Sequence, residues 1–243
     1  MKKIFILFGI IFFGIPDVCF AWGPMTHTYF AHEVLRAASL LSASVYTLLT
    51  AYSTNFIYGS IAADNFLGKP GHKNPHDWET GFLLLSHARK NTDAAFAYGF
   101  LTHLAADTVA HGQMDLGAKS KLGHAWIEME SDSLMAKSCW KAVVGLDKDR
   151  LKSNDRLARL VIDPQACRSR GFQQIYRMSI HMSVLNSRRW TNFYKEDFAG
   201  YHRMSVIRAI DVINKKEDSK FVHHDPNIKK GRKFSARLQN ILA

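Results

Sequence analysis

The chain has 243 residues, of which 47% are hydrophobic and 22% charged, and its formal net charge is +11 at pH 7. This apolar content excludes an intrinsically disordered chain, and the length is enough for one sizeable hydrophobic core or two small ones. Beyond the first 21 residues only Cys139 and Cys167 remain, which could pair in an exported protein but are too few for a thiolate zinc site. A metal site in this chain must therefore use histidines and carboxylates.

The first 21 residues have the pattern of a secretory signal peptide. Two lysines precede an apolar run of about 12 residues, and the sequence CFA at 19–21 offers a cleavage site. The run is shorter than the roughly 20 residues that span a bilayer, and the alternative is an uncleaved anchor. We expect cleavage after Ala21, a secreted or periplasmic protein, and a mature domain of residues 22–243 that begins with Trp22.

The mature chain is basic. The leader contributes +1, which leaves +10, and this charge gathers near the C-terminus, above all in the run KKGRK at 229–233. A net positive charge of this size is typical of a protein that binds an anionic surface such as phospholipid, nucleic acid or cell wall. The alternative is an ordinary solvated face with a basic tail.

Apolar residues recur at helical spacing through most of the mature chain, and alternating strand patterns are scarce. Glycine and proline mark loops at 68–75 and 112–123. The helical stretches are 26–49, 91–111, 123–144, 173–190 and 201–216. These patterns predict an all-α, single-domain multi-helix bundle, completed by helices in the second half.

The sequence HLAADTVAH, residues 103–111, carries the clearest chemical signal. His103, Asp107 and His111 are four residues apart, and each step of four turns a helix by only about 40°, so the three side chains share one stripe. Their neighbours are Leu, Ala and Val, among which a buried aspartate is costly unless it is paired or bound to metal. A single histidine there would more often be a core residue with its hydrogen bonds satisfied, but three potential ligands in register favour a metal site.

Further candidate ligands surround this stripe. His124 and Glu128 repeat the four-residue spacing in HAWIE, Asp64 ends the apolar segment GSIAAD, and His76 lies in NPHDW. Taken alone, each is ordinary: such pairs form helix salt bridges, and Asp and His are common in loops. His72, in the same loop, is the alternative to His76.

As an ordered set, these motifs resemble the bacterial zinc-dependent phospholipases C, whose wider superfamily includes fungal zinc single-strand nucleases. The matching motifs are WGPMTH at 22–27, GSIAAD, HDW, HLAADTVAH and HAWIE. The resemblance implies a helical fold with three zinc ions. The close spacing of Asp107 and His111 is more similar to lipase-like domains that cleave glycosylphosphatidylinositol than to the better-known members.

The resemblance also implies how nine positions share the ions. One zinc would take the free amino group and carbonyl of Trp22, with His27 and Asp107. Another would take Asp64, His76, His103 and the bridging Asp107, and the third His111, His124 and Glu128. Signal cleavage would then create a ligand, and loading would depend on pH because the amine must lose its proton.

Closely spaced zinc ions suit phosphate ester hydrolysis, because they neutralise phosphate oxygens and lower the pKa of a bound water towards about 7. The resemblance implies that Asp64 orients or deprotonates the attacking water. We expect a phospholipase C that acts on phospholipid or another phosphodiester, with apolar Phe66, Leu67 and Trp78 either receiving acyl chains or packing in the core. The alternatives are an exported nuclease, an enzyme for sugar phosphates or phosphoproteins, and a non-catalytic zinc-binding envelope protein.

Overall fold

The computed structural model describes residues 22–66, 73–113, 131–146, 151–162 and 195–227, and within these ranges the chain contains no β-strand. The α-helices are α2 (Pro24–Arg36), α3 (Ala43–Ala51), α4 (Ser53–Ser60), α5 (Trp78–His87), α6 (Asn91–Gln113), α8 (Lys137–Val144), α9 (Lys152–Val161) and α11 (Lys195–Lys215). Short 3-10 helices are η1 (Ala38–Leu40), η2 (Ala63–Asn65), η3 (Lys216–Asp218) and η4 (Lys220–His223). The prediction of an all-α multi-helix fold is confirmed. None of the helices in the described ranges is long and apolar enough to cross a bilayer.

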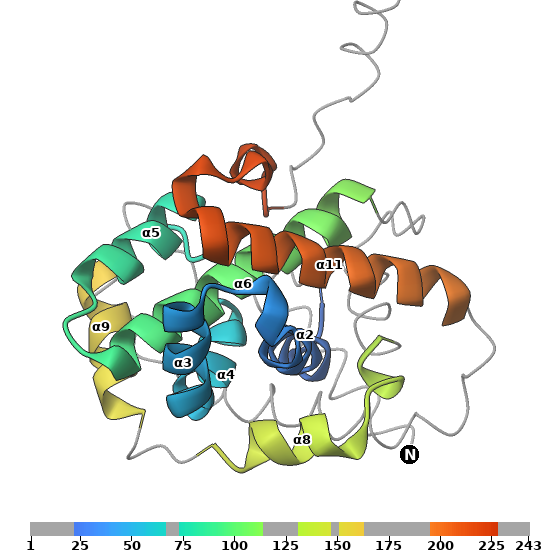
Figure 1. Ribbon diagram of the computed structural model, residues 1–243, viewed down its shortest axis with the longest axis horizontal. Helices are drawn as coiled ribbons and strands as arrows, with labels where there is room; N and C mark the ends of the chain where they lie inside the picture. Colours follow the sequence, from blue (N-terminus) through green and yellow to red (C-terminus); the bar gives the residue numbers. More distant parts are fainter. Residues whose placement is uncertain (1–21, 67–72, 114–130, 147–150, 163–194, 228–243) are drawn as a thin grey trace, which may run out of the picture.

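Helix α6 is the central element, in contact with α2, α4, α5, α9 and α11, and α11 lies across it (Figure 1). Its apolar residues are buried on every side, from Ala95 to Val109. A helix that is hydrophobic all round is expected in the interior rather than at the surface. The histidine and aspartate that α6 carries are therefore held in the middle of the protein.

Helices α4 and α6 meet through two glycines. A Cβ atom on Gly59 would lie 2.0 Å from the carbonyl oxygen of Phe96, and one on Gly99 would lie 2.0 Å from the carbonyl oxygen of Phe56. Side chains at either position would force the two backbones apart. This close approach brings the C-terminal end of α4, and with it the following segment to Asp64, against the middle of α6.

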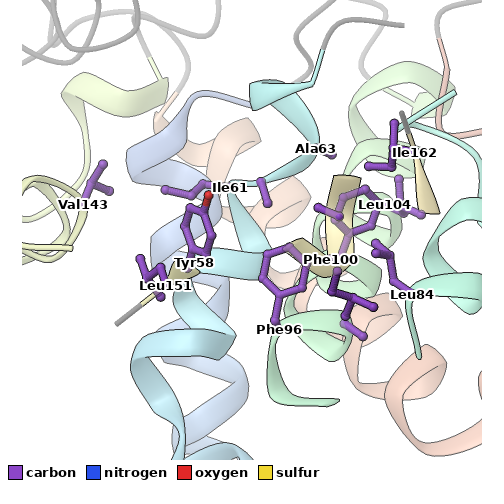
Figure 2. Packing of buried hydrophobic residues seen from close by; sticks show 14 of the residues in the cluster. Tyr58, Ile61, Ala63, Leu84, Phe96, Phe100, Leu104, Val143, Leu151 and Ile162 are labelled. Atoms are coloured by element: carbon purple, nitrogen blue, oxygen red, sulfur yellow. The ribbon is translucent and has the colours of Figure 1, made fainter. Parts of the chain in front are cut away.

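The core forms around the same helix. Phe96, Phe100 and Leu104 form one cluster with Tyr58 and Ile61, from α4 and the turn after it, and with residues from α5, α8 and α9 or next to these helices (Figure 2). On another side, α6 packs with α3, α4 and α11. Packing from several directions leaves α6 little freedom to move.

The predicted helical stretches miss α4, α5 and α9, and the stretch 26–49 is divided between α2 and α3. Two further differences lie at Gly112 and before α8. Gly112 does not open a loop but lies within the last turn of α6, whereas the rest of the expected loop, residues 114–123, lies outside the described ranges. The amphipathic stretch 123–144 is interrupted in its described part: a turn in which the Ser131 and Asp132 carbonyls accept hydrogen bonds from the Leu134 and Met135 amides precedes α8. This turn lets α8 pack back against α2.

Candidate metal centre

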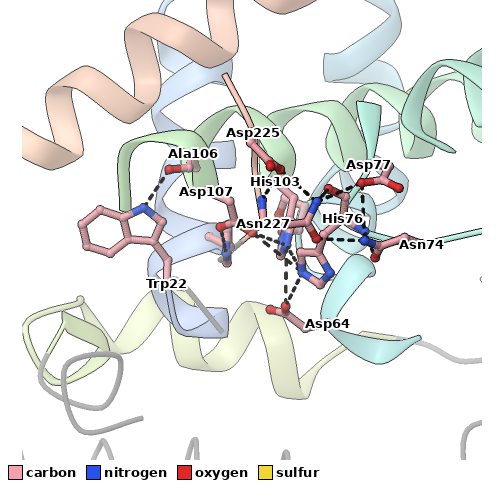
Figure 3. A network of polar contacts seen from close by, with 12 residues as sticks. Trp22, Asp64, Asn74, His76, Asp77, His103, Ala106, Asp107, Asp225 and Asn227 are labelled. Carbon is pink, nitrogen blue, oxygen red and sulfur yellow. Dashed lines mark hydrogen bonds and ion pairs between the residues drawn. The ribbon is translucent and has the colours of Figure 1, made fainter. Parts of the chain in front are cut away.

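Four separate segments bring their histidines and aspartates to one place. His27 comes from α2. Asp64 comes from η2, His76 from the loop before α5, and His103 with Asp107 from α6 (Figure 3). The side chains of four of them are at most 1% exposed, whereas that of His76 is 15% exposed. The cluster is therefore buried and reaches solvent on the His76 side.

Four donor atoms of this cluster converge: Nε2 of His76, Nε2 of His103, Oδ1 of Asp64 and Oδ2 of Asp107. The His76 nitrogen lies 3.3 Å from that of His103, 3.2 Å from Asp64 and 3.7 Å from Asp107. The His103 nitrogen lies 3.6 Å from Asp64 and 3.1 Å from Asp107. Ligands of a tetrahedral zinc ion, each about 2.0–2.1 Å from the metal, stand about 3.3–3.4 Å apart. Five of the six separations among these four atoms are therefore close to those around a zinc ion.

His27 approaches the same carboxylate from the other side. Its Nε2 atom lies 3.3 Å from Oδ1 of Asp107, and its ring stacks on that of His103 with centroids 3.9 Å apart. Donor atoms of His27, Asp64 and His103 also lie within 4.8 Å of one another. Asp107 thus presents one oxygen to the His76–His103 pair and the other to His27, an arrangement in which a carboxylate can bridge two ions.

Several polar atoms of the cluster are buried without a hydrogen-bond partner among the described residues. These atoms are both ring nitrogens of His27, both carboxylate oxygens of Asp107, and Oδ2 of Asp64. Unpaired buried polar groups cost free energy, and native proteins rarely keep them without a bound water or ion. A bound cation would provide this missing partner.

The carboxylates govern the protonation of the metal-free cluster. Burial would lower the pKa of His103, but Asp107 and Asp64 outweigh it and raise this pKa to about 9. Burial would raise the pKa of Asp107, but His103 outweighs it and holds this pKa well below its usual range. For His27, burial and the neighbouring His103 lower the pKa. A metal ion bound at His103 must therefore displace a proton.

A backbone carbonyl on the far side of the ring from the cluster also orients His103. Its Nδ1 atom lies 3.0 Å from the carbonyl oxygen of Ser60, at the C-terminal end of α4, where carbonyls lack partners within their own helix. Donation from Nδ1 to this oxygen leaves Nε2 free to face Asp64 and Asp107. Ser60 was not a candidate in the sequence, because a backbone carbonyl leaves no signature in the choice of residue.

Trp22 lies beside the cluster with its side chain fully buried. Its indole nitrogen donates to the carbonyl oxygen of Ala106, 3.0 Å away and one residue before Asp107. Its ring also meets those of Phe30 and His202 edge-on. The indole therefore fixes the start of the expected mature chain next to Asp107.

A third aspartate, Asp132, which the sequence did not single out, holds the N-terminus of α2. Oδ1 of Asp132 accepts from the amide and the hydroxyl of Thr26, at 2.8 Å each, and Oδ2 accepts from the amide of Met25 at 3.2 Å. The N-cap residue Gly23 provides no such bond, and a Cβ on it would lie 2.4 Å from the Asp132 carboxylate. Burial raises the pKa of Asp132 to about 7, against the effect of these hydrogen bonds. Asp132 thus caps the helix that carries His27 from more than a hundred residues away.

The remaining predicted ligands are placed only in part. His111 lies half-buried in the last turn of α6, one turn beyond Asp107, and is not in the groups of donor atoms that the described residues bring together. His124 and Glu128 lie outside the described residues, as do the alternative ligand His72 and the apolar Leu67. Phe66 and Trp78 pack against the main core cluster. Cys139 is a buried free thiol, and Cys167 lies outside the described ranges.

Together, the fold and the cluster define a helical protein with a buried histidine–aspartate centre suited to zinc. The sequence model of one family, zinc dependent phospholipase C, matches residues 26–203, which is most of the chain. The chain therefore belongs to the zinc-dependent phospholipase C family, as its motifs predicted. Comparison with curated proteins and with solved structures found no match. Membership supports zinc-dependent hydrolysis of phosphodiester bonds, and all five clustered residues lie within the matched range.

Proposed function

We propose that this chain is an exported phospholipase C that hydrolyses the phosphodiester bond of phospholipid head groups at a site for three zinc ions. The observation that carries the proposal is the zinc-like spacing of the donor atoms of Asp64, His76, His103 and Asp107. Oδ2 of Asp64 has no hydrogen-bond partner among the described residues, and a bound ion or its water would provide one.

We assign these four residues to one ion. His27 and the second oxygen of Asp107 would serve another ion, together with the amino group and carbonyl that Trp22 gains on cleavage of the leader after Ala21. His111, with His124 and Glu128, would serve the third. Bound zinc would supply positive charge for the phosphate oxygens and a water of lowered pKa.

Asp64 is our candidate for the general base. One of its oxygens faces the Nε2 atoms of His76 and His103, and the other, Oδ2, has no hydrogen-bond partner among the described residues. A carboxylate held in this way can orient a water molecule and accept its proton at short range. Water and substrate would approach along the His76 side, where the cluster is least covered.

Phospholipid is the substrate we favour because the family that matches the chain is zinc dependent phospholipase C, and the charge of the chain is compatible with it. The expected mature chain carries +10, which attracts it to anionic membrane surfaces. A single-strand nuclease would need exposed aromatic rings on which bases stack. Near the cluster, Phe66 and Trp78 are only partly buried but pack against the core, which leaves them poorly placed for stacking bases and for receiving acyl chains.

The test is to express the gene with its leader and collect the processed protein. We expect N-terminal sequencing to begin at Trp22, two to three zinc ions per chain, and release of diacylglycerol from phosphatidylcholine vesicles. Cleavage of single-stranded DNA without lipid hydrolysis would identify a nuclease instead. Zinc without hydrolysis of any phosphodiester would identify a non-catalytic zinc protein.

The role of Asp64 has its own test. Asp64→Asn keeps an oxygen that can face the ion, so most of the zinc should remain bound. Turnover should fall by about 10²–10⁴-fold, the usual contribution of a general base. The matched control is Glu33→Gln on α2, a residue paired with the exposed Arg36 and not part of the cluster, which should be fully active. Full activity of Asp64→Asn would exclude Asp64 as the base.

A further inference from the structure

The end of the described chain returns to the candidate metal centre. The family match ends at residue 203, within α11, but the chain continues through η3 and η4 to Asn227. This C-terminal segment, residues 216–227, brings Asn227 to the loop that carries His76 (Figure 3). A contact between these two residues joins positions 151 apart in the sequence.

Asn227 binds the His76 loop with both ends of its side-chain amide. Its Nδ2 atom donates to the carbonyl oxygen of His76 and to Oδ1 of Asp77, each at 2.9 Å. Its Oδ1 atom accepts from Nδ2 of Asn74 at 2.9 Å. The Asn227 side chain is therefore hydrogen-bonded to Asn74 and Asp77, on either side of His76, and to the backbone of His76 itself.

The loop is already partly ordered by its own side chains. Oδ1 of Asn74 accepts from the amide of His76 at 3.0 Å, and the carbonyl of Asn74 accepts from the hydroxyl of Thr80 at 2.7 Å. Asn227 therefore acts on a turn that has a defined shape, and adds a connection to the rest of the protein.

The C-terminal segment is itself attached at several points. The Ser219 hydroxyl donates to Oδ2 of Asp211 at 2.6 Å, and the Arg208 guanidinium lies 5.1 Å from the ring centroid of Phe221. Nearer the loop, the indole nitrogen of Trp78 donates to the carbonyl oxygen of His224 at 2.8 Å. The segment thus connects the His76 loop to α11, which packs on α6.

We propose that Asn227 is a positioning residue for His76, and that residues 216–227 hold the metal-binding loop in place. His76 is the most exposed member of the cluster and lies in a loop, whereas its partners lie on helices or on the 3-10 helix η2. Such a ligand needs its backbone fixed by surrounding hydrogen bonds to stay within bonding range. This inference rests on the proposed function only in taking His76 as a zinc ligand.

Zinc retention tests the inference. We expect Asn227→Ala to bind zinc about 10–100-fold more weakly at one site, as losses of outer partners of metal ligands usually do. Zinc affinity would be measured by competition with a chromophoric chelator, alongside thermal unfolding of the metal-free protein. The matched control is Asn214→Ala. Asn214 also joins distant segments, because its Nδ2 donates to the Leu40 carbonyl at 2.7 Å, but it does not touch the His76 loop.

The zinc affinities and metal-free stabilities of the two variants distinguish a failure of the positioning role from a failure of the proposed function. The positioning role is supported if only Asn227→Ala binds zinc more weakly, while the metal-free forms of the two variants unfold at similar temperatures. Equal weakening in both variants, or wild-type affinity in Asn227→Ala, overturns it. If the wild-type protein binds zinc but hydrolyses no phosphodiester, the proposed function fails while the zinc comparison still decides the role of Asn227.

Discussion

The two sides of the cluster are held in place by different interactions. His27, His103 and Asp107 project from α2 and α6, whose backbones are fixed by apolar packing and by the close approach of α4 to α6. His76 projects from a loop that polar side chains fix, with Asn227 as the connection to the C-terminal segment. Both sides meet at the carboxylate of Asp107.

This difference determines what a mutation should disturb. On the helical side, the positions of the ligands depend on the same packing that stabilises the fold, so damage should first lower the free energy of unfolding. On the loop side, a few hydrogen bonds near the surface hold the ligand, so damage should first weaken zinc binding. Variants on the helical side can test this separation.

The largest expected effect is at the contact between α4 and α6. In Gly99→Ala the new methyl group would lie 2.0 Å from the backbone oxygen of Phe56, which cannot rotate away. We expect a loss of about 3 kcal/mol in the free energy of unfolding, the upper end of the usual range for overpacking. Urea denaturation of the metal-free protein measures it.

The same helix offers a matched control. Nothing lies within 4 Å of a Cβ placed on Gly112, near the end of α6. Gly112→Ala should therefore be neutral or stabilise the protein by up to about 1 kcal/mol, because alanine favours a helix more than glycine does. Equal free energies of unfolding for the two variants would show that the close contact of α4 and α6 at Gly99 does not contribute to stability.

A smaller effect is expected at the N-terminus of α2. Asp132→Ala removes the acceptor for the amides of Met25 and Thr26, and we expect it to cost about 2 kcal/mol, as for the loss of a strong helix cap. Zinc content should also fall, because His27 lies in the first turn of this helix. Thr26→Val removes only the hydroxyl contact and should cost about 1 kcal/mol. Normal stability of Asp132→Ala would show that Gly23 and solvent suffice as the cap.

Sequence reasoning found the part of the site that follows a helical period. The four-residue steps of His103, Asp107 and His111 predicted one stripe, and the structure places the first two in the cluster and the third one turn beyond it. His27 and Asp64 could be predicted as ligands only from the order of the motifs, because they lie on other elements and share no helical period with the stripe.

The residues that support the ligands could not be predicted in this way. Ser60 acts through a carbonyl that every residue has, and Asp132 and Asn227 act on partners more than a hundred residues away. Gly59 and Gly99 fit an ordinary helical pattern, and only the packing of α4 on α6 shows why a side chain would not fit there. Contacts between distant segments depend on the fold and not on local sequence.

The last expected effect is a dependence of zinc binding on pH. In the metal-free protein the pKa of His103 is raised to about 9, above its ordinary value of 6.5, so its protonated form stabilises the fold. That stabilisation is complete below about pH 6.5 and is lost as the pH rises through about 9. Zinc competes with the same proton, so its affinity should rise about tenfold per pH unit up to about pH 9 and then level off.

Chelator competition at several pH values, together with unfolding of the metal-free protein, measures both trends. They should have opposite signs between pH 6.5 and 9, with zinc affinity rising while the metal-free protein loses stability. A free amino group at Trp22, with an ordinary pKa of about 7.7–8.0, would add a second competing proton below pH 8 and steepen the rise there. Zinc affinity that stays constant from pH 6.5 to 9 would mean that His103 gives up no proton to the metal, and would remove this residue from the zinc site.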